Sequence, residues 1–121
     1  MDTILTTGLY VDYYDIMKKL IKEFEFNGIK IKLYDEDLAH AQEEHSEATP
    51  ESIEACICNP DMVIESKRGK NACLFYEVKT KDNYFVVVVH VVGAGLGEIR
   101  TAYDSDYIKD GRVIYKKEEL K

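Results

Sequence analysis

The sequence predicts an α+β fold, with N-terminal helices packed on a four- to five-stranded antiparallel sheet. In the first half of the chain, apolar residues recur at helical spacing, and beyond residue 60 they fall in short β-rich runs between turn residues. A length of 121 residues suits one hydrophobic core. We therefore expect a single domain over 1–121, with an N-terminal helix and an edge segment in 1–34 and the other helices and the sheet in 35–121.

The first predicted element is a helix over 11–25. Its buried stripe consists of five large side chains at spacings of four, three, four and three, namely Tyr10, Tyr14, Met17, Ile21 and Phe24. Asn27-Gly28 ends this helix. Apolar residues and lysines then alternate over 29–33, which predicts a short, half-exposed strand at an edge of the sheet.

A second helix is predicted from Asp35 to about Ser46, because Asp35 or Asp37 can cap the free N–H groups of its first turn. At about 100° per residue, Leu38, Ala41 and His45 share one stripe. His40 falls on the opposite side of this helix. The two histidines therefore do not serve one compact site from the same helix face.

A third helix begins at Thr49-Pro50, because threonine is a good N-cap and proline suits the first helical position. Its predicted buried face consists of Ile53, Cys56 and Ile57. Asn59-Pro60 ends it, since the residue before a proline is pushed out of helical geometry.

Five strands are predicted beyond this point, over 62–67, 72–80, 84–92, 98–103 and 113–116. The links between them are short and rich in turn residues, which favours antiparallel hairpins. Phe85–Val89 is apolar without alternation and is predicted to be the central strand, buried on both faces. No helix pattern follows the glycines of 93–97, which favours a flexible hairpin over a phosphate-binding loop.

The charge distribution restricts the partners. Sixteen basic and 23 acidic residues give a net charge of −7, so a nucleic-acid site has to be local. Residues 35–54 hold acidic side chains and no lysine or arginine, whereas Lys67–Lys81 is mainly basic. The acidic run also fits a solvated helical face.

The sequence predicts neither a membrane span nor a secretory signal, and we expect a cytoplasmic protein. The three cysteines are odd in number and fall in predicted elements, so we expect buried thiols rather than a disulfide or metal site. His40 and His45 do not form the His-Glu-x-x-His zinc motif. No metal or other cofactor is predicted.

Three motifs in order resemble a known family. They are His40–His45, Asn59–Met62 and Ile99–Tyr103, with a valine-rich strand before the last. This order resembles the phage- and mobile-element-borne nuclease domains of the barnase–EndoU–colicin–RelE superfamily, over about 38–115. The resemblance implies a metal-independent ribonuclease, often a toxin, that is built from helices on an antiparallel sheet.

The same resemblance implies site residues. His40 and His45 match the two motif histidines, and Thr101 matches the threonine of the last strand. Glu44 stands where the family pattern has arginine. This departure removes a cation and adds an anion that repels phosphate or holds an imidazolium.

Cleavage of RNA through its own 2′-hydroxyl requires a base, an acid and donors for the phosphorane oxygens. We expect His45 to be the acid or base and Thr101 to donate a hydrogen bond to phosphate, with the positive charge coming from Arg100, Lys79 or Lys67. Arg100 and Thr101 point to opposite faces of a regular strand, which favours Thr101. A cognate antitoxin or inhibitor is a candidate partner besides RNA.

Two binding functions remain open. In the first, an acidic inhibitor or immunity protein presents the carboxylates of 35–54 to a basic partner. In the second, the nuclease scaffold has lost catalysis and only binds. The inhibitor hypothesis predicts a tight complex that is sensitive to salt and no loss of function when His45 is replaced. The alternative to a catalytic role is that His45 is a packed core histidine and Thr101 an ordinary strand residue.

Overall fold

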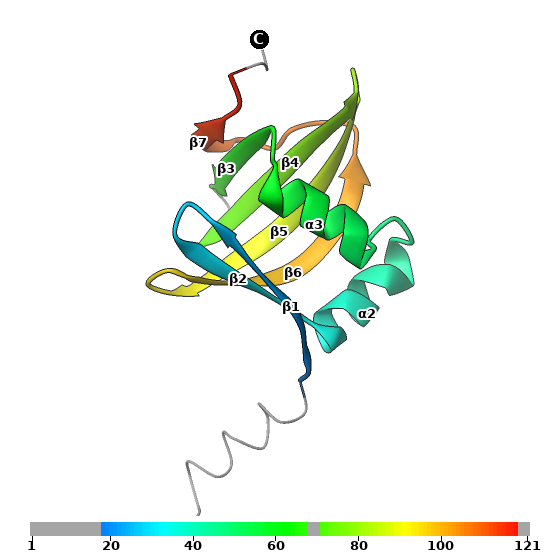
Figure 1. The fold of residues 1–121 in the computed structure, drawn as a ribbon. Coiled ribbons are helices and arrows are strands. Elements are labelled where there is room, and N and C mark those ends of the chain that lie inside the picture. The colour runs from blue at the N-terminus through cyan, green and yellow to red at the C-terminus, as the bar shows by residue number, and fades with distance from the viewer. Residues whose placement is uncertain (1–17, 68–70, 119–121) are drawn as a thin grey trace, which may run out of the picture.

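The computed structural model describes residues 18–67 and 71–118. In this part of the chain, seven strands form one sheet and two helices lie against it (Figure 1). The elements in chain order are β1 (Leu20–Phe26), β2 (Ile29–Tyr34), α2 (Asp35–Glu44), α3 (Pro50–Cys58), β3 (Met62–Ser66), β4 (Ala72–Thr80), β5 (Asn83–Gly93), β6 (Leu96–Ser105) and β7 (Gly111–Lys116). The predicted α+β class is confirmed.

The sheet is larger than predicted and it is mixed. Its strand order is β1-β2-β6-β5-β4-β3-β7. β2 pairs with β6 in parallel, while the other neighbouring strands pair antiparallel. The prediction of four to five antiparallel strands was wrong, because 20–34 adds a hairpin and joins the sheet through a parallel pairing between segments far apart in sequence.

The predicted helix over 11–25 is wrong for its described part, where Leu20–Phe26 forms β1. Phe24 and Phe26 alternate with Glu23 and Glu25, and both glutamates lie opposite lysines of β2. Asn27 and Gly28 have φ of 48° and 81°, which suits a two-residue hairpin turn. Tyr10, Tyr14 and Met17 lie outside the described residues.

The predicted strand over 29–33 is confirmed, but its predicted place at the sheet edge is wrong. β2 lies between β1 and β6, and pairs with β6 through three residues from Lys30 to Lys32. Two of its apolar residues, Ile31 and Leu33, are fully buried. The edges of the sheet are β1 and β7.

Both predicted helices between β2 and β3 are present. At α3 the hydroxyl of Thr49 accepts from the N–H of Ser52 and the hydroxyl of Ser52 accepts from the N–H of Thr49, so the predicted cap is confirmed. At α2 the predicted aspartate N-cap is wrong in position, although Asp35 accepts from an N–H group of the first turn as expected. The N-cap is Tyr34, without a side-chain cap, and the Asp35 carboxylate accepts from the backbone N–H groups of Glu36 and Lys19.

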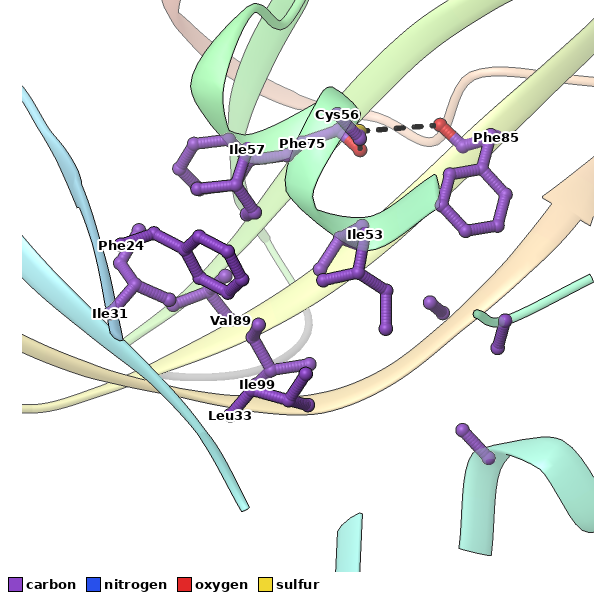
Figure 2. Close-up of a cluster of buried hydrophobic side chains, with 14 of the residues drawn as sticks. Phe24, Ile31, Leu33, Ile53, Cys56, Ile57, Phe75, Phe85, Val89 and Ile99 are labelled. Carbon is purple, nitrogen blue, oxygen red and sulfur yellow. Dashed lines mark hydrogen bonds between the residues drawn. The ribbon is translucent and has the colours of Figure 1, made fainter. Parts of the chain in front are cut away.

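The main core lies between the sheet and α3. Ile53, Cys56 and Ile57 of α3 are buried against the apolar residues of β4 and β5, as predicted (Figure 2). β1 also contacts α3, where the Lys22 ammonium donates to Glu54 at 2.6 Å. Burying side chains of this size contributes about 1.5–3 kcal/mol each before entropy is counted.

The sheet curls so that its two ends approach each other. The ring of Phe26 on β1 lies 5.2 Å from the ring of Phe75 on β4 and 5.2 Å from that of Tyr115 on β7, centroid to centroid. In Figure 1 the β1–β2 hairpin accordingly lies in front of the central strands, on the same side as the helices. The concave face of the sheet therefore holds α3 and the tip of this hairpin.

The other face of the sheet carries a second apolar cluster, which contains Tyr76 and Val86 together with Ile108 from the loop between β6 and β7. The hydroxyl of Tyr76 accepts from the backbone N–H of Lys109 at 3.0 Å. This bond and the burial of Ile108 fix the loop on the sheet. β5 is central and has buried residues in both clusters, as predicted.

Three smaller predictions also have an outcome. The glycines of 93–97 form the predicted β5–β6 hairpin turn. Cys56, Cys58 and Cys73 are all free, but Cys58 is exposed, so the expectation of buried thiols holds only in part. No helix among the described residues is long and apolar enough to cross a membrane.

Candidate functional site

The site is built at the open side of β6. β2 pairs only with the first residues of β6, from Leu96 to Glu98. Farther along β6, the segment after α2 contacts the strand in place of β2. There the Glu47 carboxylate accepts from the backbone N–H of Asp104 at 2.9 Å. The end of β6 and the loop that follows α2 are thereby held together.

His45 lies in this loop and not on the buried helix stripe that the sequence predicts. It is the C-cap of α2, with φ of −137° and ψ of 90°, and its N–H donates to the carbonyl of Ala41. The chain then turns, with the N–H of Ala48 donating to the carbonyl of His45 at 3.0 Å. The helix ends one residue before His45, so the imidazole faces β6 from the helix terminus.

The imidazole of His45 packs on the phenol ring of Tyr103. The ring centroids are 5.4 Å apart and the planes are tilted by 37°. The side chain of His45 is 34% exposed, so one side of the ring is packed and the other is open to solvent. Such a half-exposed imidazole can exchange protons with a bound molecule.

An open pocket of about 570 Å³ lies in front of these two rings. Its lining comes from the His45 loop, the start of β5, the end of β6 and the following loop. The residues are His45, Asn83, Tyr103, Asp104, Ser105, Asp106, Tyr107 and Lys109. We refer to it as the His45 pocket.

Lys109 brings a positive charge into the His45 pocket. Its Nζ lies 5.8 Å from the ring centroid of Tyr103. Hydrogen bonding to the Tyr103 phenol is the main cause that raises the pKa of Lys109, which therefore carries its charge at neutral pH. The His45 imidazole, the Tyr103 phenol and the Lys109 ammonium thus share one concave surface.

Two carboxylates flank His45. Glu44 Oε1 lies 3.8 Å from Nε2, and Glu47 Oε2 lies 3.8 Å from Nδ1. Partial burial acts to raise the pKa of Glu47, but hydrogen bonds from the N–H groups of Asp104 and Glu47 itself, together with the nearby His45, lower it overall. Glu47 is therefore an anchored anion, whereas the Glu44 side chain is 75% exposed and is free to move.

Thr101 belongs to the same face of β6 as Tyr103, two residues earlier. It is half-buried and lies opposite Val88 of β5, while Tyr103 lies opposite Val86. Thr101 does not line the His45 pocket. Its predicted contact with phosphate stays a prediction.

The other predicted residues are dispersed. The side chain of His40 is 74% exposed on α2, with Nδ1 4.0 Å from Glu43. Arg100 is exposed and lies close enough to Asp37 to lower the pKa of that carboxyl, although burial of Asp37 raises it overall. Neither His40 nor Arg100 lines the His45 pocket.

The two predicted lysines lie on different faces of the sheet. Lys79 Nζ is 5.9 Å from the ring centroid of Phe85, a residue of the main core, and 3.9 Å from the Glu77 carboxylate. Lys67 is exposed and lines a separate pocket next to the β6–β7 loop. The structure therefore brings His45 together with Lys109 and not with the cations expected from the sequence.

The Asp of the Asn-Pro-Asp motif has a structural role. The carboxylate of Asp61 accepts from the N–H of Val78 at 2.7 Å, its N–H donates to the carbonyl of Tyr76, and its carbonyl accepts from the N–H of Lys117. Asp61 therefore connects the start of β3 to β4 and to the end of β7.

The sequence did not identify Tyr103, Lys109 and Tyr107 as site residues. Tyr103 lies two residues after Thr101 and therefore on the same face of the strand. This spacing is the sequence signal that could have identified Tyr103 as a site residue. Lys109 lies in the loop between β6 and β7, where no periodicity indicates the direction of a side chain. No group of three or more His, Cys, Asp or Glu side chains in 18–67 and 71–118 is arranged to hold a metal ion.

Comparisons of this chain with known protein families, with curated proteins and with solved structures find no match.

Proposed function

We propose that this protein is a ribonuclease-like domain that cleaves RNA by attack of a 2′-hydroxyl on the neighbouring phosphate, without a metal ion. The observation that carries the proposal is the convergence of His45, Tyr103 and Lys109 on one open pocket. These side chains supply a proton acceptor, a proton donor and a cation, which are the groups that the reaction requires.

In the proposed reaction, the imidazole of His45 takes the proton of the 2′-hydroxyl. The 2′-oxygen forms a bond to phosphorus while the bond from phosphorus to the 5′-oxygen breaks. The phenol of Tyr103 gives its proton to the leaving 5′-oxygen. Lys109 stabilises the negative charge on the phosphorane and on the phenolate, and the products are a 2′,3′-cyclic phosphate and a free 5′-hydroxyl.

The carboxylate on each side of the imidazole has its own part in this proposal. Glu47 is anchored to Asp104 and lies on the Nδ1 side, so it holds the ring in place and is close to the charge that the imidazole gains. Glu44 lies on the Nε2 side, and its high exposure lets it move away when a phosphate approaches. Glu44 therefore lowers the affinity for the substrate without blocking the site.

A chimeric oligonucleotide tests the reaction directly. A DNA strand with a single ribonucleotide is incubated with the protein in the presence of a chelator, beside an all-deoxy strand of the same sequence. We expect cleavage only on the 3′ side of the ribonucleotide, with a cyclic phosphate end identified by mass spectrometry. Cleavage of the all-deoxy strand, or no cleavage of either strand, contradicts the proposal.

One observation favours a binding function as a second candidate. α2 has three acidic residues in its first turn and no basic residue in its last turn, and Glu43 and Glu44 are both 75% exposed. This acidic surface suits a basic protein partner, as an inhibitor or immunity protein requires. A stoichiometric complex that weakens with salt and persists in the His45→Ala variant supports this candidate.

A further inference from the structure

A second pocket of about 500 Å³ lies beside the His45 pocket. The two pockets share Tyr107 and Lys109, both from the loop between β6 and β7. We propose that the second pocket binds a further nucleotide of a single-stranded RNA, beyond the dinucleotide at the scissile bond, so that the substrate runs across the loop from one pocket to the other. This inference rests on the proposed ribonuclease function.

The floor of the second pocket is apolar and suits a nucleobase. Leu74 of β4 and Val88 of β5 lie directly opposite each other in the sheet, with Ala72 on the same face of β4. Ile108 adds an apolar wall from the loop. A base that is stacked in a duplex cannot enter such a concave surface, whereas an unpaired base can.

The rim of the second pocket is cationic and suits a phosphate. Lys67 and Lys109 both line it, against one carboxylate, that of Asp110. The two lysines suit the anionic phosphate of a nucleotide, and the apolar floor suits its aromatic base. The protein has a net charge of −7, so this local excess of positive charge distinguishes the pocket from the average surface.

Tyr107 belongs to both pockets, whereas Thr101 lines neither. Tyr107 is 56% exposed and lines both, so its ring is available for stacking on a base. Thr101 lies opposite Val88 of the second pocket and two residues from Tyr103 of the first.

The loop between the pockets is held in a defined shape without a ligand. The Tyr107 N–H donates to the Ser105 hydroxyl at 3.3 Å, and this hydroxyl donates to the Tyr107 carbonyl at 2.9 Å. The Lys109 N–H donates to the hydroxyl of Tyr76. Both pockets are therefore present before the substrate binds, which reduces the entropy cost of binding.

The test uses binding, so that it does not depend on cleavage. Fluorescein-labelled oligodeoxyadenylates of two and of six nucleotides lack the attacking hydroxyl, and their affinity is measured by fluorescence anisotropy. We expect the hexanucleotide to bind at least about tenfold more tightly than the dinucleotide, because only the longer strand reaches both pockets.

Two variants and a matched control locate the effect. Lys67→Gln and Tyr107→Ala are each expected to weaken hexanucleotide binding by about tenfold, and only Lys67→Gln reduces the salt dependence, by about one counterion. Lys30→Gln removes the same charge from an exposed position that lines neither pocket, and leaves the affinity unchanged. Both replaced side chains of the second pocket are exposed, so the fold is retained, which circular dichroism checks.

The proposal is overturned if the hexanucleotide binds no more tightly than the dinucleotide, or if Lys67→Gln and Tyr107→Ala bind it as the control does. Failure of the ribonuclease proposal gives a different result. The DNA strand with the single ribonucleotide then stays intact, whereas the affinities for the oligodeoxyadenylates can still be measured. The two proposals are thus tested by independent readouts.

Discussion

The carboxylate of Glu47 accepts a hydrogen bond from the backbone N–H of Asp104 at 2.9 Å, and this bond ties the loop after α2 to the end of β6. The two residues are 57 positions apart in the chain. The bond therefore closes a long loop and keeps His45 against Tyr103. The position of the imidazole depends on a tertiary contact and not only on the helix before it.

This contact predicts a dependence of stability on pH. The pKa of Glu47 is lowered from its ordinary value of 4.5, so the charged carboxylate contributes stability above that value and loses it as the pH falls through the lower folded value. Glu47→Gln is expected to reduce the free energy of unfolding by about 1 kcal/mol at neutral pH. Urea unfolding measures the difference in unfolding free energy between the wild type and Glu47→Gln, and this difference is expected to become smaller in acid.

The control for this experiment is Glu43→Gln, because the Glu43 side chain is 75% exposed on α2. A surface carboxylate of this kind contributes little, so we expect its replacement to change the unfolding free energy by less than about 0.5 kcal/mol. A loss in Glu47→Gln that is as large in acid as at neutral pH contradicts the assignment.

A second prediction concerns the phenol of Tyr103. Tyr103→Phe retains the ring that packs on His45 and removes the hydroxyl, so we expect kcat to fall by about 10²-fold with the fold unchanged. Tyr84→Phe is the matched control, since the Tyr84 hydroxyl donates to the carbonyl of Lys81 and the residue lines neither pocket at the β6–β7 loop. Equal kcat values for the two variants exclude a role of the Tyr103 hydroxyl in the reaction.

A third prediction separates the cation found in the structure from one expected from the sequence. Lys109→Gln is expected to lower kcat/KM by about 10²-fold, because it removes the charge that stabilises the phosphorane in the proposed reaction. Lys79→Gln removes an exposed lysine that packs near Phe85 on the helix face, and is expected to have no effect. Steady-state kinetics on one RNA oligonucleotide compares the kcat/KM values of the two variants. A larger loss for Lys79→Gln than for Lys109→Gln contradicts the assignment of Lys109 and favours Lys79.

The secondary structure could be predicted where the signal is local. Thr49-Pro50 caps α3 as expected because the cap needs only Ser52, three residues away. The central position of β5 followed from its unbroken apolar run. Both features depend on residues that are adjacent in the chain or on composition alone.

The first described strand could not be assigned from the helical spacing of Ile21 and Phe24. The same residues fit a strand, in which Phe24 and Phe26 face the core and Ile21 is 43% exposed. Asn27-Gly28 suits a helix end as well as a hairpin turn, and its positive φ angles form the hairpin turn here. The parallel pairing of β2 with β6 joins segments more than 60 residues apart, and no local pattern encodes it.

The candidate site was predicted only in part. His45 was identified, but its position past the helix end depends on the Glu47 bond to Asp104, and the cation beside it comes from a loop. Periodicity gives the direction of side chains in helices and strands and says nothing about loops. A basic residue such as Lys109 is therefore found only when the fold is known.

A fourth prediction concerns the three cysteines. Burial raises the pKa of the Cys56 thiol, whose Sγ–H also donates to the carbonyl of Phe75 at 3.3 Å, so little reactive thiolate forms. Cys58 is exposed and Cys73 is half-buried. A thiol reagent is expected to modify Cys58 rapidly, Cys73 slowly and Cys56 only after unfolding. Rapid modification of Cys56 in the folded protein contradicts the packing of α3.

The most direct test of the central claim is the rate at which His45→Gln forms 2′,3′-cyclic phosphate ends on a defined single-stranded RNA. The matched control is His40→Gln, which replaces an exposed imidazole on α2. We predict that His45→Gln lowers kcat/KM by at least about 10²-fold, while His40→Gln retains the wild-type value. Equal rates for His45→Gln and the wild type contradict the proposal that His45 transfers the proton.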